Sequence, residues 1–481
     1  MIMTRTWLYC AILSFVLIFS LANGHEIEGT TTSPYRIVID GGSTGSRLHI
    51  FEFLLNNETN EAECIGRGSL SVWTPLSDFA NASNNPHAVA EHLFPLFDFA
   101  ATNIPSRYHA STTVTYQGTA GMRLLQTQTQ QDVYDALYEG LQSWPHFVFS
   151  SLQRHHIATL DGNEEAYFAA VAANYLHGTV TANLTRREPS QQLLGALDMG
   201  GSSTQIVFRK EQQQQQQHSR KLHPTHFSST SYLSFGAQQF RTKLWDDLSS
   251  KYHHHHNNTS IHNPCAFSGH ITTHNAHTFV GTGNATHCAM HINNLLPHHE
   301  LHTPPHNAQT NFLAMSLYFF ALDCLKEISL LFTTTHPSYA KLHDSWPNPS
   351  IQELTDALDP FCLHSWHHDL QPIQHHAHKY TSPNILPHRC FEAVYIVTLL
   401  RDGYKFPLSS RSITFAHLLH GNQVEWSLGM ALSLHDAHHH HHHESSLDVV
   451  VVVKNEEDIC VGKNSCTLED DCRHLLSSSL S

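Results

Sequence analysis

Residues 35–53 read YRIVIDGGSTGSRLHIFEF: an apolar run that ends in Asp40, a loop of glycine and hydroxyl residues, and a second apolar run. Apolar, β-branched runs on either side of a glycine loop predict a strand, a tight turn and a second strand. The glycines permit a sharp turn that brings backbone N–H groups close to a ligand, and the hydroxyl groups add donors. The loop suits a phosphate chain, although most Gly-Ser turns between strands bind nothing. The candidate phosphate contacts are Ser43, Thr44, Ser46 and Arg47.

A second stretch, residues 194–208, repeats the pattern as LGALDMGGSSTQIVF. An apolar run again ends in an aspartate, Asp198, before a glycine and hydroxyl loop and a further apolar run. Two such units a domain's length apart predict two similar domains that hold one ligand between their loops. Asp40 and Asp198 can each hold a divalent cation, Mg²⁺ or Ca²⁺, through its waters. The second set of candidate phosphate contacts is Gly200, Gly201, Ser202 and Ser203.

The composition limits the possible partners. The chain has 481 residues, of which 40% are hydrophobic, enough for more than one domain. Its formal net charge of -15 argues against nucleic-acid binding, which needs a basic surface. An acidic protein that binds polyphosphate must supply positive charge locally, from a metal ion, a few arginines or backbone N–H groups.

The N-terminus indicates the secretory route. Arg5 precedes an apolar run over residues 7–22 that closes with small residues, as in a signal peptide over residues 1–24. The run is short for a membrane-spanning helix, so we expect cleavage; an uncleaved anchor, which would bind the protein to a membrane, is the alternative. Ten cysteines and six N-x-S/T sequons also favour a secreted or lumenal protein. The sequons begin at Asn57, Asn81, Asn183, Asn257, Asn258 and Asn284.

A third candidate loop lies over residues 118–121, between a strand-like run at 112–116 and a helix predicted from Met122. A loop that leads from a strand into a helix N-terminus can bind an anion, and Thr119 and Arg123 are the candidate contacts. The alternative is an ordinary β–α connection, which this stretch alone would favour.

Within residues 157–176 the sequence predicts a helix that follows Asp161, with two adjacent glutamates in its first turn. Asp161 at the N-cap and Glu164 three residues later would form a capping box, which gives Glu164 a structural role. Glu165 is then the carboxylate available to act as general base on a water molecule. The alternative is that Glu165 only complements the helix dipole.

Aromatic residues gather in two predicted helices of the second half. Residues 311–331 contain three consecutive rings that end in Phe320, and residues 391–400 are followed by Tyr404. Ring clusters are usually core, but an exposed ring can stack on a nucleobase, and Phe320 and Tyr404 are the candidates.

Low-complexity runs interrupt the chain at residues 212–217 (glutamine), 253–256 and 438–443 (both histidine). Histidine runs can bind transition metals, but solvated inserts are more common, and we assign no metal to them. The tail, residues 437–481, changes in composition and is expected to be poorly ordered. Its cysteines lack zinc-finger spacing, so a disulfide with a spare thiol is the better interpretation. The tail residues concerned are Cys460, Cys466, Cys472 and His474.

Five stretches resemble, in order, the conserved regions of the apyrase family, the nucleoside triphosphate diphosphohydrolases of the GDA1/CD39 family. Five motifs in the right order are specific where one would not be, and the resemblance covers most of residues 35–434. The stretches are residues 40–47, 118–123, 161–176 and 195–205, and a fifth region split between 391–406 and 426–429.

The resemblance implies a role for each matching residue. Asp40 and Asp198 match the aspartates that hold Ca²⁺ or Mg²⁺ through water, and Glu165 matches the catalytic base. Ser203 and Gln205 match residues that position the attacking water. The two glycine loops and Thr119 resemble phosphate contacts, and Phe320 falls where the family places a base-stacking ring.

The cysteines also resemble the family pattern, which pairs Cys265 with Cys288 and Cys362 with Cys390. The chain departs from the pattern at Ala166, where a glycine is usual, and at Gly118, where an alanine is usual. An arginine that helps to clamp the base in some members has no evident match here.

The resemblance further implies an α/β fold of the actin-like ATPase (ribonuclease H-like) architecture, with the active site in the cleft between two domains. We expect residues 35–174 with 413–434 to form the first domain. Residues 175–412, which carry low-complexity inserts, would form the second.

The leading functional hypothesis is a monomeric, secreted or lumenal apyrase. It would hydrolyse the terminal phosphate of nucleoside tri- and diphosphates with a divalent cation and a water activated by Glu165. An exopolyphosphatase, which shares the architecture and the loops, is one alternative, but such a substrate needs no ring to stack on. A non-catalytic secreted protein that binds nucleotide or metal is another, and the presence of Glu165 and both aspartates counts against it.

Overall fold

The computed structural model describes residues 32–445 except 83, 189, 211–219, 253–259, 305–309 and 333–335. The chain divides into two compact units, which we describe separately. The first consists of residues up to 54 together with 65–161, and the second of residues 55–64 together with those from 162 onward. The predicted signal peptide, the glutamine run, the histidine run at 253–256 and the three tail cysteines lie outside the described residues.

The first unit is built on a five-stranded sheet of order β3-β2-β1-β4-β5. β1 and β2 form the antiparallel hairpin that the opening stretch of sequence predicts, and β4 lies parallel to both β1 and β5. The strands are β1 (Tyr35–Gly42), β2 (Gly45–Leu55), β3 (Ala62–Val72), β4 (Thr113–Gly118) and β5 (Ile157–Thr159).

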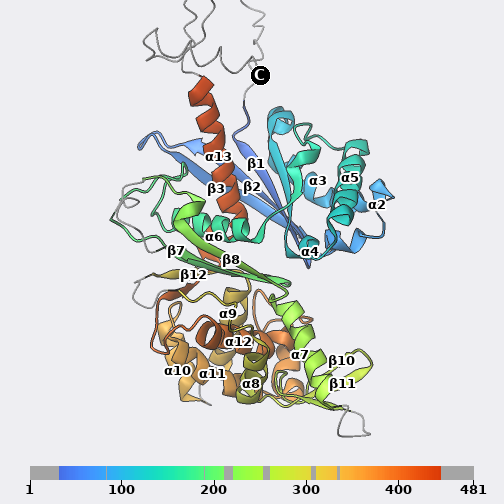
Figure 1. The fold of residues 1–481 in the computed structure, drawn as a ribbon, viewed down its shortest axis with the longest axis vertical. Coiled ribbons are helices and arrows are strands. Elements are labelled where there is room, and N and C mark those ends of the chain that lie inside the picture. Colours follow the sequence, from blue (N-terminus) through green and yellow to red (C-terminus); the bar gives the residue numbers. More distant parts are fainter. Residues whose placement is uncertain are drawn as a thin grey trace, which may run out of the picture. The chain divides into compact units, whose positions relative to one another are not determined.

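Helices α2, α3 and α5 lie together on one side of this sheet (Figure 1). The 17-residue helix α5 buries apolar side chains with helical spacing, including Val133, Leu137 and Leu141, against the core of the unit. The helices are α2 (Pro86–Glu91), α3 (Phe94–Asn103), α4 (Ala120–Arg123) and α5 (Thr127–Ser143).

The second unit is built on a sheet of the same topology. Its sheet has the order β13-β12-β6-β7-β8, in which β6 and β7 form an antiparallel hairpin and β12 runs parallel to β6 and β13. The predicted pair of related α/β units is thereby confirmed. The strands are β6 (Gly195–Met199), β7 (Ser203–Arg209), β8 (Phe227–Leu233), β12 (Phe312–Ala314) and β13 (Ile413–Phe415).

The core of the second unit lies among its helices, several of which form a bundle in Figure 1 (α8 to α12). No helix in the described part of the chain is both long and apolar enough to span a membrane. The helices are α6 (Gly162–Leu176), α7 (Ala237–Tyr252), α8 (Ala285–Leu295), α9 (Leu317–Leu331), α10 (Pro337–Ser345), α11 (Ile351–Leu363), α12 (Arg389–Thr398) and α13 (Trp426–Ser445). A small sheet, β9 (Ile261–Asn263), β10 (Ile271–His274) and β11 (His277–Gly281), completes the unit, with a short hairpin of β14 (Leu418–Leu419) and β15 (Asn422–Gln423).

Two details differ from the sequence-based expectation. The helix expected over residues 311–331 begins only at Leu317, because residues 312–314 form β12 between β6 and β13. Helix α13 continues to Ser445, beyond the point at which the poorly ordered tail was expected to start.

The unit boundary also differs from the expected one. It falls between Asp161 and Gly162, so α6 belongs to the second unit, where it packs against α13 and the β6–β8 strands. Residues 413–415 join the sheet of the second unit through parallel pairing with β12, whereas residues 413–434 were expected to return to the first domain.

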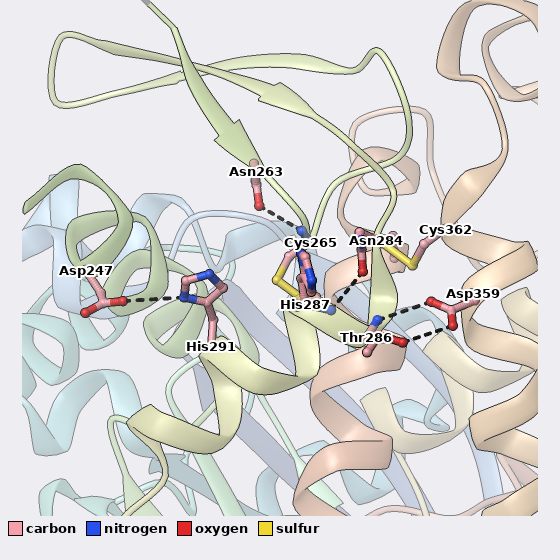
Figure 2. The surroundings of a disulfide bond; sticks show 11 residues. Asp247, Asn263, Cys265, Asn284, Thr286, His287, His291, Asp359 and Cys362 are labelled. Carbon is pink, nitrogen blue, oxygen red and sulfur yellow. Dashed lines mark hydrogen bonds and ion pairs between the residues drawn. A yellow bond between two sulfur atoms is a disulfide. The ribbon is translucent and has the colours of Figure 1, made fainter. Parts of the chain in front are cut away.

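Two disulfides brace the second unit, and they are the predicted pairs Cys265–Cys288 and Cys362–Cys390. Figure 2 shows the first at the start of α8. There the side chain of Asn284 caps the helix by accepting a hydrogen bond from the N–H of His287 (2.8 Å), and Thr286 bonds the Asp359 carboxylate of α11. Among the described cysteines, Cys64 and Cys324 are buried and form no disulfide.

Reduction of the disulfides should lower the stability of the protein. The bridges close loops of 23 and 28 residues, and each such bridge is worth about 2–4 kcal/mol of folding free energy. We expect a lower melting temperature in the presence of reductant, and peptide mass spectrometry of unreduced protein should show both bridges. Free thiols at all four positions in secreted protein would contradict the pairing.

Candidate functional site

The first glycine loop, residues 41–46, is the turn between β1 and β2. The hairpin register pairs Gly42 with Gly45, so Ser43 and Thr44 form the tip, and it places Arg47 opposite Asp40. The loop after β4 lies beside this turn, because both the N–H and the hydroxyl of Thr119 donate to the carbonyl oxygen of Gly41 (2.9 and 3.3 Å). The structure thus brings together the candidate phosphate contacts of the first unit.

The Tyr116 side chain packs against this loop. Its buried ring lies so close under Gly41 that a β-carbon there would be 2.3 Å from the Tyr116 hydroxyl. The same hydroxyl hydrogen-bonds the Ser46 hydroxyl (3.1 Å), and Ser46 is only 1% exposed. Ser46 was expected to contact phosphate through its side chain; instead that side chain faces the core, because it lies on the inward face of β2.

The Gly41→Ala substitution should therefore be costly. The new methyl group would overlap three atoms of the Tyr116 side chain, which is fully buried and has no room to move, so we expect a loss of about 1–3 kcal/mol in stability. Gly200→Ala is the matched steric control, since the nearest atom to its β-carbon would be 3.9 Å away. Thermal melting of both variants tests this, and equal destabilisation would contradict it.

The two candidate arginines of the first unit are held by neighbouring segments. The Nε of Arg47 donates to the hydroxyl of Ser71 in β3 (2.8 Å), and Nη1 of Arg123 donates to the Leu160 carbonyl (3.2 Å). Ser71 was not anticipated from the sequence. A guanidinium group carries five N–H donors, so both arginines remain candidates for phosphate binding.

The second glycine loop, residues 200–203, connects β6 and β7 and is fixed by the start of α7. The carbonyls of Gly200 and Gly201 accept hydrogen bonds from backbone N–H groups of residues 237–239, at 2.9 to 3.1 Å. Because the N–H and C=O groups of a trans peptide point in opposite directions, carbonyls tied to α7 turn the N–H groups of Gly201 and Ser202 away from that helix, whereas the N–H of Gly200 donates to the carbonyl of Ser203 (3.0 Å). The loop can therefore present backbone donors to an anion.

Glu165 lies beside the second loop, on the first turn of α6. Nε2 of Gln205 donates to Oε2 of Glu165 (3.1 Å), and it also lies 2.8 Å from the Ser203 hydroxyl and 3.1 Å from that of Ser231. Glu165 is 6% exposed, and Ser203 and Gln205 are buried with it. The three residues expected to act on water are thus in one connected group, and Ser231 of β8 is an addition that the sequence did not indicate.

Glu164 lies elsewhere. It is exposed and lines a separate crevice of about 1060 Å³ together with residues such as Lys210 and His223. Of the two adjacent glutamates, Glu165 is therefore the one placed with Ser203 and Gln205.

Asp198 is the penultimate residue of β6, close to the second loop, and is 5% exposed. Burial is the main cause that raises the pKa of its carboxyl to about 6, and the nearby Glu425 carboxylate is a smaller cause in the same direction. Hydrogen bonds from the Ser316 hydroxyl and the Met199 N–H act in the opposite direction. A carboxylate in this position is destabilised by the loss of water and would be stabilised by a positive charge nearby.

The two proposed base-stacking rings have different surroundings. Phe320, on the first turn of α9, is partly exposed in a ring cluster with Tyr380 and His417, whose centroids lie 5.5 and 5.0 Å away. Tyr404 is 0% exposed and packs near Tyr232 in the core of the second unit. Its expected role as a base-stacking residue is therefore corrected, because no face of its ring is open to a ligand.

Comparison with known proteins identifies the family to which this fold and these loops belong. The GDA1/CD39 (nucleoside phosphatase) family profile matches residues 26–449. The chain belongs to the GDA1/CD39 family. It is 26% identical to the Golgi apyrase of Schizosaccharomyces pombe over 83% of this chain and 74% of that protein. It is 24% identical to ectonucleoside triphosphate diphosphohydrolase 2 of Gallus gallus, over 87% and 86% of the two chains.

The fold also matches that of a solved structure. Nucleoside triphosphate hydrolases from Neospora caninum align with a TM-score of 0.59 at 14% identity, over 87% of this chain and 96% of that one. With the two related sheets, this confirms the α/β, actin-like ATPase fold class. Membership of the GDA1/CD39 family confirms the expectation of a hydrolase that acts on nucleoside phosphates.

The residues fit a divalent cation held through water. Members of the GDA1/CD39 family require such ions, and the buried carboxylate of Asp198 offers the hard oxygen ligands that Mg²⁺ and Ca²⁺ prefer. Within the described residues, no three histidine, cysteine or acidic side chains converge to form a direct metal cage. A buried carboxylate of this kind can bind such an ion through the waters that the ion keeps.

Proposed function

We propose that this member of the GDA1/CD39 family is an apyrase that hydrolyses the terminal phosphate of nucleoside tri- and diphosphates with a divalent cation. The observation that supports the proposal most strongly is the buried group of Glu165, Gln205 and Ser203 beside a glycine loop. It combines a possible proton acceptor, polar groups that can orient water, and backbone donors for phosphate within one unit.

In the proposed reaction Glu165 takes a proton from a water molecule as that water attacks the terminal phosphorus in line. An ionised carboxylate can accept about four hydrogen bonds, so the bond from Gln205 leaves Glu165 able to bind the water. Gln205 and Ser203 orient the water and keep the carboxylate in place. No residue needs to form a covalent bond to phosphorus.

The remaining site residues bind the phosphates. The N–H groups of the two glycine loops act as donors, together with the Ser43, Thr44 and Thr119 side chains and the Arg47 and Arg123 guanidinium groups. When bound, the cation offsets phosphate charge, and Asp40 and Asp198 would hold its waters. Phe320 would stack on the base.

The cellular setting is also a proposal. The signal-like N-terminus, the sequons and the two disulfides support a glycosylated protein that is secreted or resides in the lumen of the secretory pathway. We propose that it acts as a monomer.

Phosphate release from ATP, ADP, UDP, GDP and tripolyphosphate tests the proposal in one assay. We expect release from nucleoside tri- and diphosphates in the presence of Mg²⁺ or Ca²⁺. Faster release from tripolyphosphate than from any nucleotide would favour an exopolyphosphatase. Binding of nucleotide without release would favour a non-catalytic protein.

A further inference from the structure

Two neighbouring rings contact Phe320, the proposed base-stacking residue on the first turn of α9. The centroid of the Tyr380 ring lies 5.5 Å from that of Phe320, with 49° between the ring planes, and the centroid of the His417 ring lies 5.0 Å away. Rings attract each other at these separations. Phe320 and Tyr380 are partly exposed, whereas His417 is buried. The orientation of Phe320 therefore depends on where Tyr380 is held.

Tyr380 belongs to neither a helix nor a strand. It lies in an irregular segment, residues 374–385, between two short 3₁₀ turns. A partly exposed segment of this kind has a fixed position only where other groups hold it. The polar residues close to Tyr380 in this segment are well placed to do so, because His378 is 6% exposed and Thr381 is 7% exposed.

The His378 imidazole ties this segment to α9. Its Nε2 lies 3.0 Å from Oδ2 of Asp323, and its Nδ1 lies 2.7 Å from the hydroxyl oxygen of Thr381. Asp323 follows Phe320 by three residues on α9, so the two side chains leave the same face of the helix. The loop that carries Tyr380 is thus fixed to α9 one turn away from the ring that Tyr380 contacts.

The hydrogen-bonded chain continues to α12. A guanidinium group has no acceptor, so the Thr381 hydroxyl accepts from Nε of Arg389 (3.0 Å). That hydroxyl can then donate its own proton to Nδ1 of His378, which leaves Nε2–H to donate to the Asp323 carboxylate. Arg389 is 2% exposed, and its Nη1 donates to Oε2 of Glu392 (2.7 Å). A buried chain that is hydrogen-bonded at each step keeps its members in one arrangement.

We propose that His378 is a positioning residue for the nucleobase: it holds the loop that presses Tyr380 against Phe320, and so fixes the ring on which the base stacks. A ring that is held in place before binding loses less conformational freedom when the base arrives, so nucleotide binds more tightly. The inference rests on the proposed function, because it assumes that Phe320 stacks on the base.

The test compares a ligand that has a base with one that has none. The readouts on the full chain are KM for ATP and the inhibition constant of tripolyphosphate, both obtained from the rate at which ADP and AMP form. A residue that positions the ring for the base alters the first constant and leaves the second unchanged. A general loss of structure in the second unit alters both.

We expect His378→Ala and Tyr380→Ala each to raise KM for ATP about 3–10-fold, and Phe320→Ala to raise it about 10-fold or more. The inhibition constant of tripolyphosphate should stay the same in all three. His378→Gln, which retains a donor and an acceptor, should restore most of the lost affinity. In a Phe320→Ala background, His378→Ala should add no further loss.

His364→Ala is the matched control. The His364 imidazole is also held between a carboxylate and a hydroxyl of the second unit, those of Asp369 (3.5 Å) and Tyr339 (3.2 Å). Its ring packs against that of Phe332, at the other end of α9 from the proposed base site. We expect this variant to leave KM for ATP unchanged, even where its melting temperature falls.

Thr381→Val gives the same test if His378→Ala does not fold, because it breaks the chain by exchanging one hydroxyl for a methyl group. A wild type that hydrolyses ATP, with variants at positions 378 and 381 that keep its KM or change both constants together, would overturn the inference alone. So would a full additional loss in the Phe320→Ala background. A Phe320→Ala variant with the wild-type KM would overturn the base-stacking assignment with it. A wild type that releases phosphate from no nucleotide would overturn the proposed function as well.

Discussion

Glu165→Gln should reduce nucleotide hydrolysis by about 10²–10⁴-fold while nucleotide binding is retained, because it removes the proton acceptor and little else. Glutamine has nearly the same shape, and its side-chain oxygen can still accept the hydrogen bond from Nε2 of Gln205. The fold around the second glycine loop should therefore survive. Phosphate release under saturating ATP and a nucleotide-binding titration together measure the effect.

Glu164→Gln is the matched control for this experiment. Glu164 is exposed and lines a different crevice, and glutamine also serves in a capping box, so we expect little change in rate. If Glu164→Gln inactivates the enzyme and Glu165→Gln does not, the assignment of the general base is incorrect.

Chelation with EDTA should abolish activity, and added Mg²⁺ or Ca²⁺ should restore it. The protein carries a formal net charge of -15, and the Asp198 carboxylate is buried next to a loop that we expect to bind phosphate. Two negative groups brought together with little water repel each other strongly, and a cation between them removes that repulsion. The measurement is phosphate release from ATP before and after chelation.

The control is a thermal melting curve in the same EDTA concentration, which separates loss of the cation from loss of the fold. Full activity at a large excess of chelator over total metal would contradict the proposed role of the cation. Loss of activity that added Mg²⁺ and Ca²⁺ do not reverse would contradict it too.

Local sequence patterns predicted much of the site. The two hairpins with their glycine loops follow from apolar runs on either side of glycine, a signal contained within residues 35–53 and within residues 194–208. The choice of Glu165 over Glu164 follows from capping logic at the start of α6, and the structure places Glu165, but not Glu164, next to Gln205.

Features that depend on long-range contacts could not be predicted in this way. The three-residue strand β12 has too few residues for a periodic pattern, and it exists because it pairs with β6 and β13. A hydroxyl in a loop looks like a phosphate contact from the sequence, yet the Ser46 side chain faces Tyr116 of β4, a strand 70 residues away. Tyr404 resembled a ligand-facing ring and is instead core.

The residues that orient others were missed for the same reason. Ser71 reaches Arg47 from β3, and Ser231 reaches Gln205 from β8. Nothing in their local sequence marks these serines, since single serines in turns and strands are common. Only the pairing of strands brings each of them to its partner.

The central claim is that water attacks the terminal phosphorus directly, with Glu165 as the base and no covalent phosphoenzyme. The stereochemistry at phosphorus tests it most directly, through hydrolysis of ATP analogues with a chiral terminal thiophosphate in isotopically labelled water. A single in-line displacement predicts inversion of configuration at that phosphorus. Retention of configuration would require two displacements through a residue of the protein and would contradict the account.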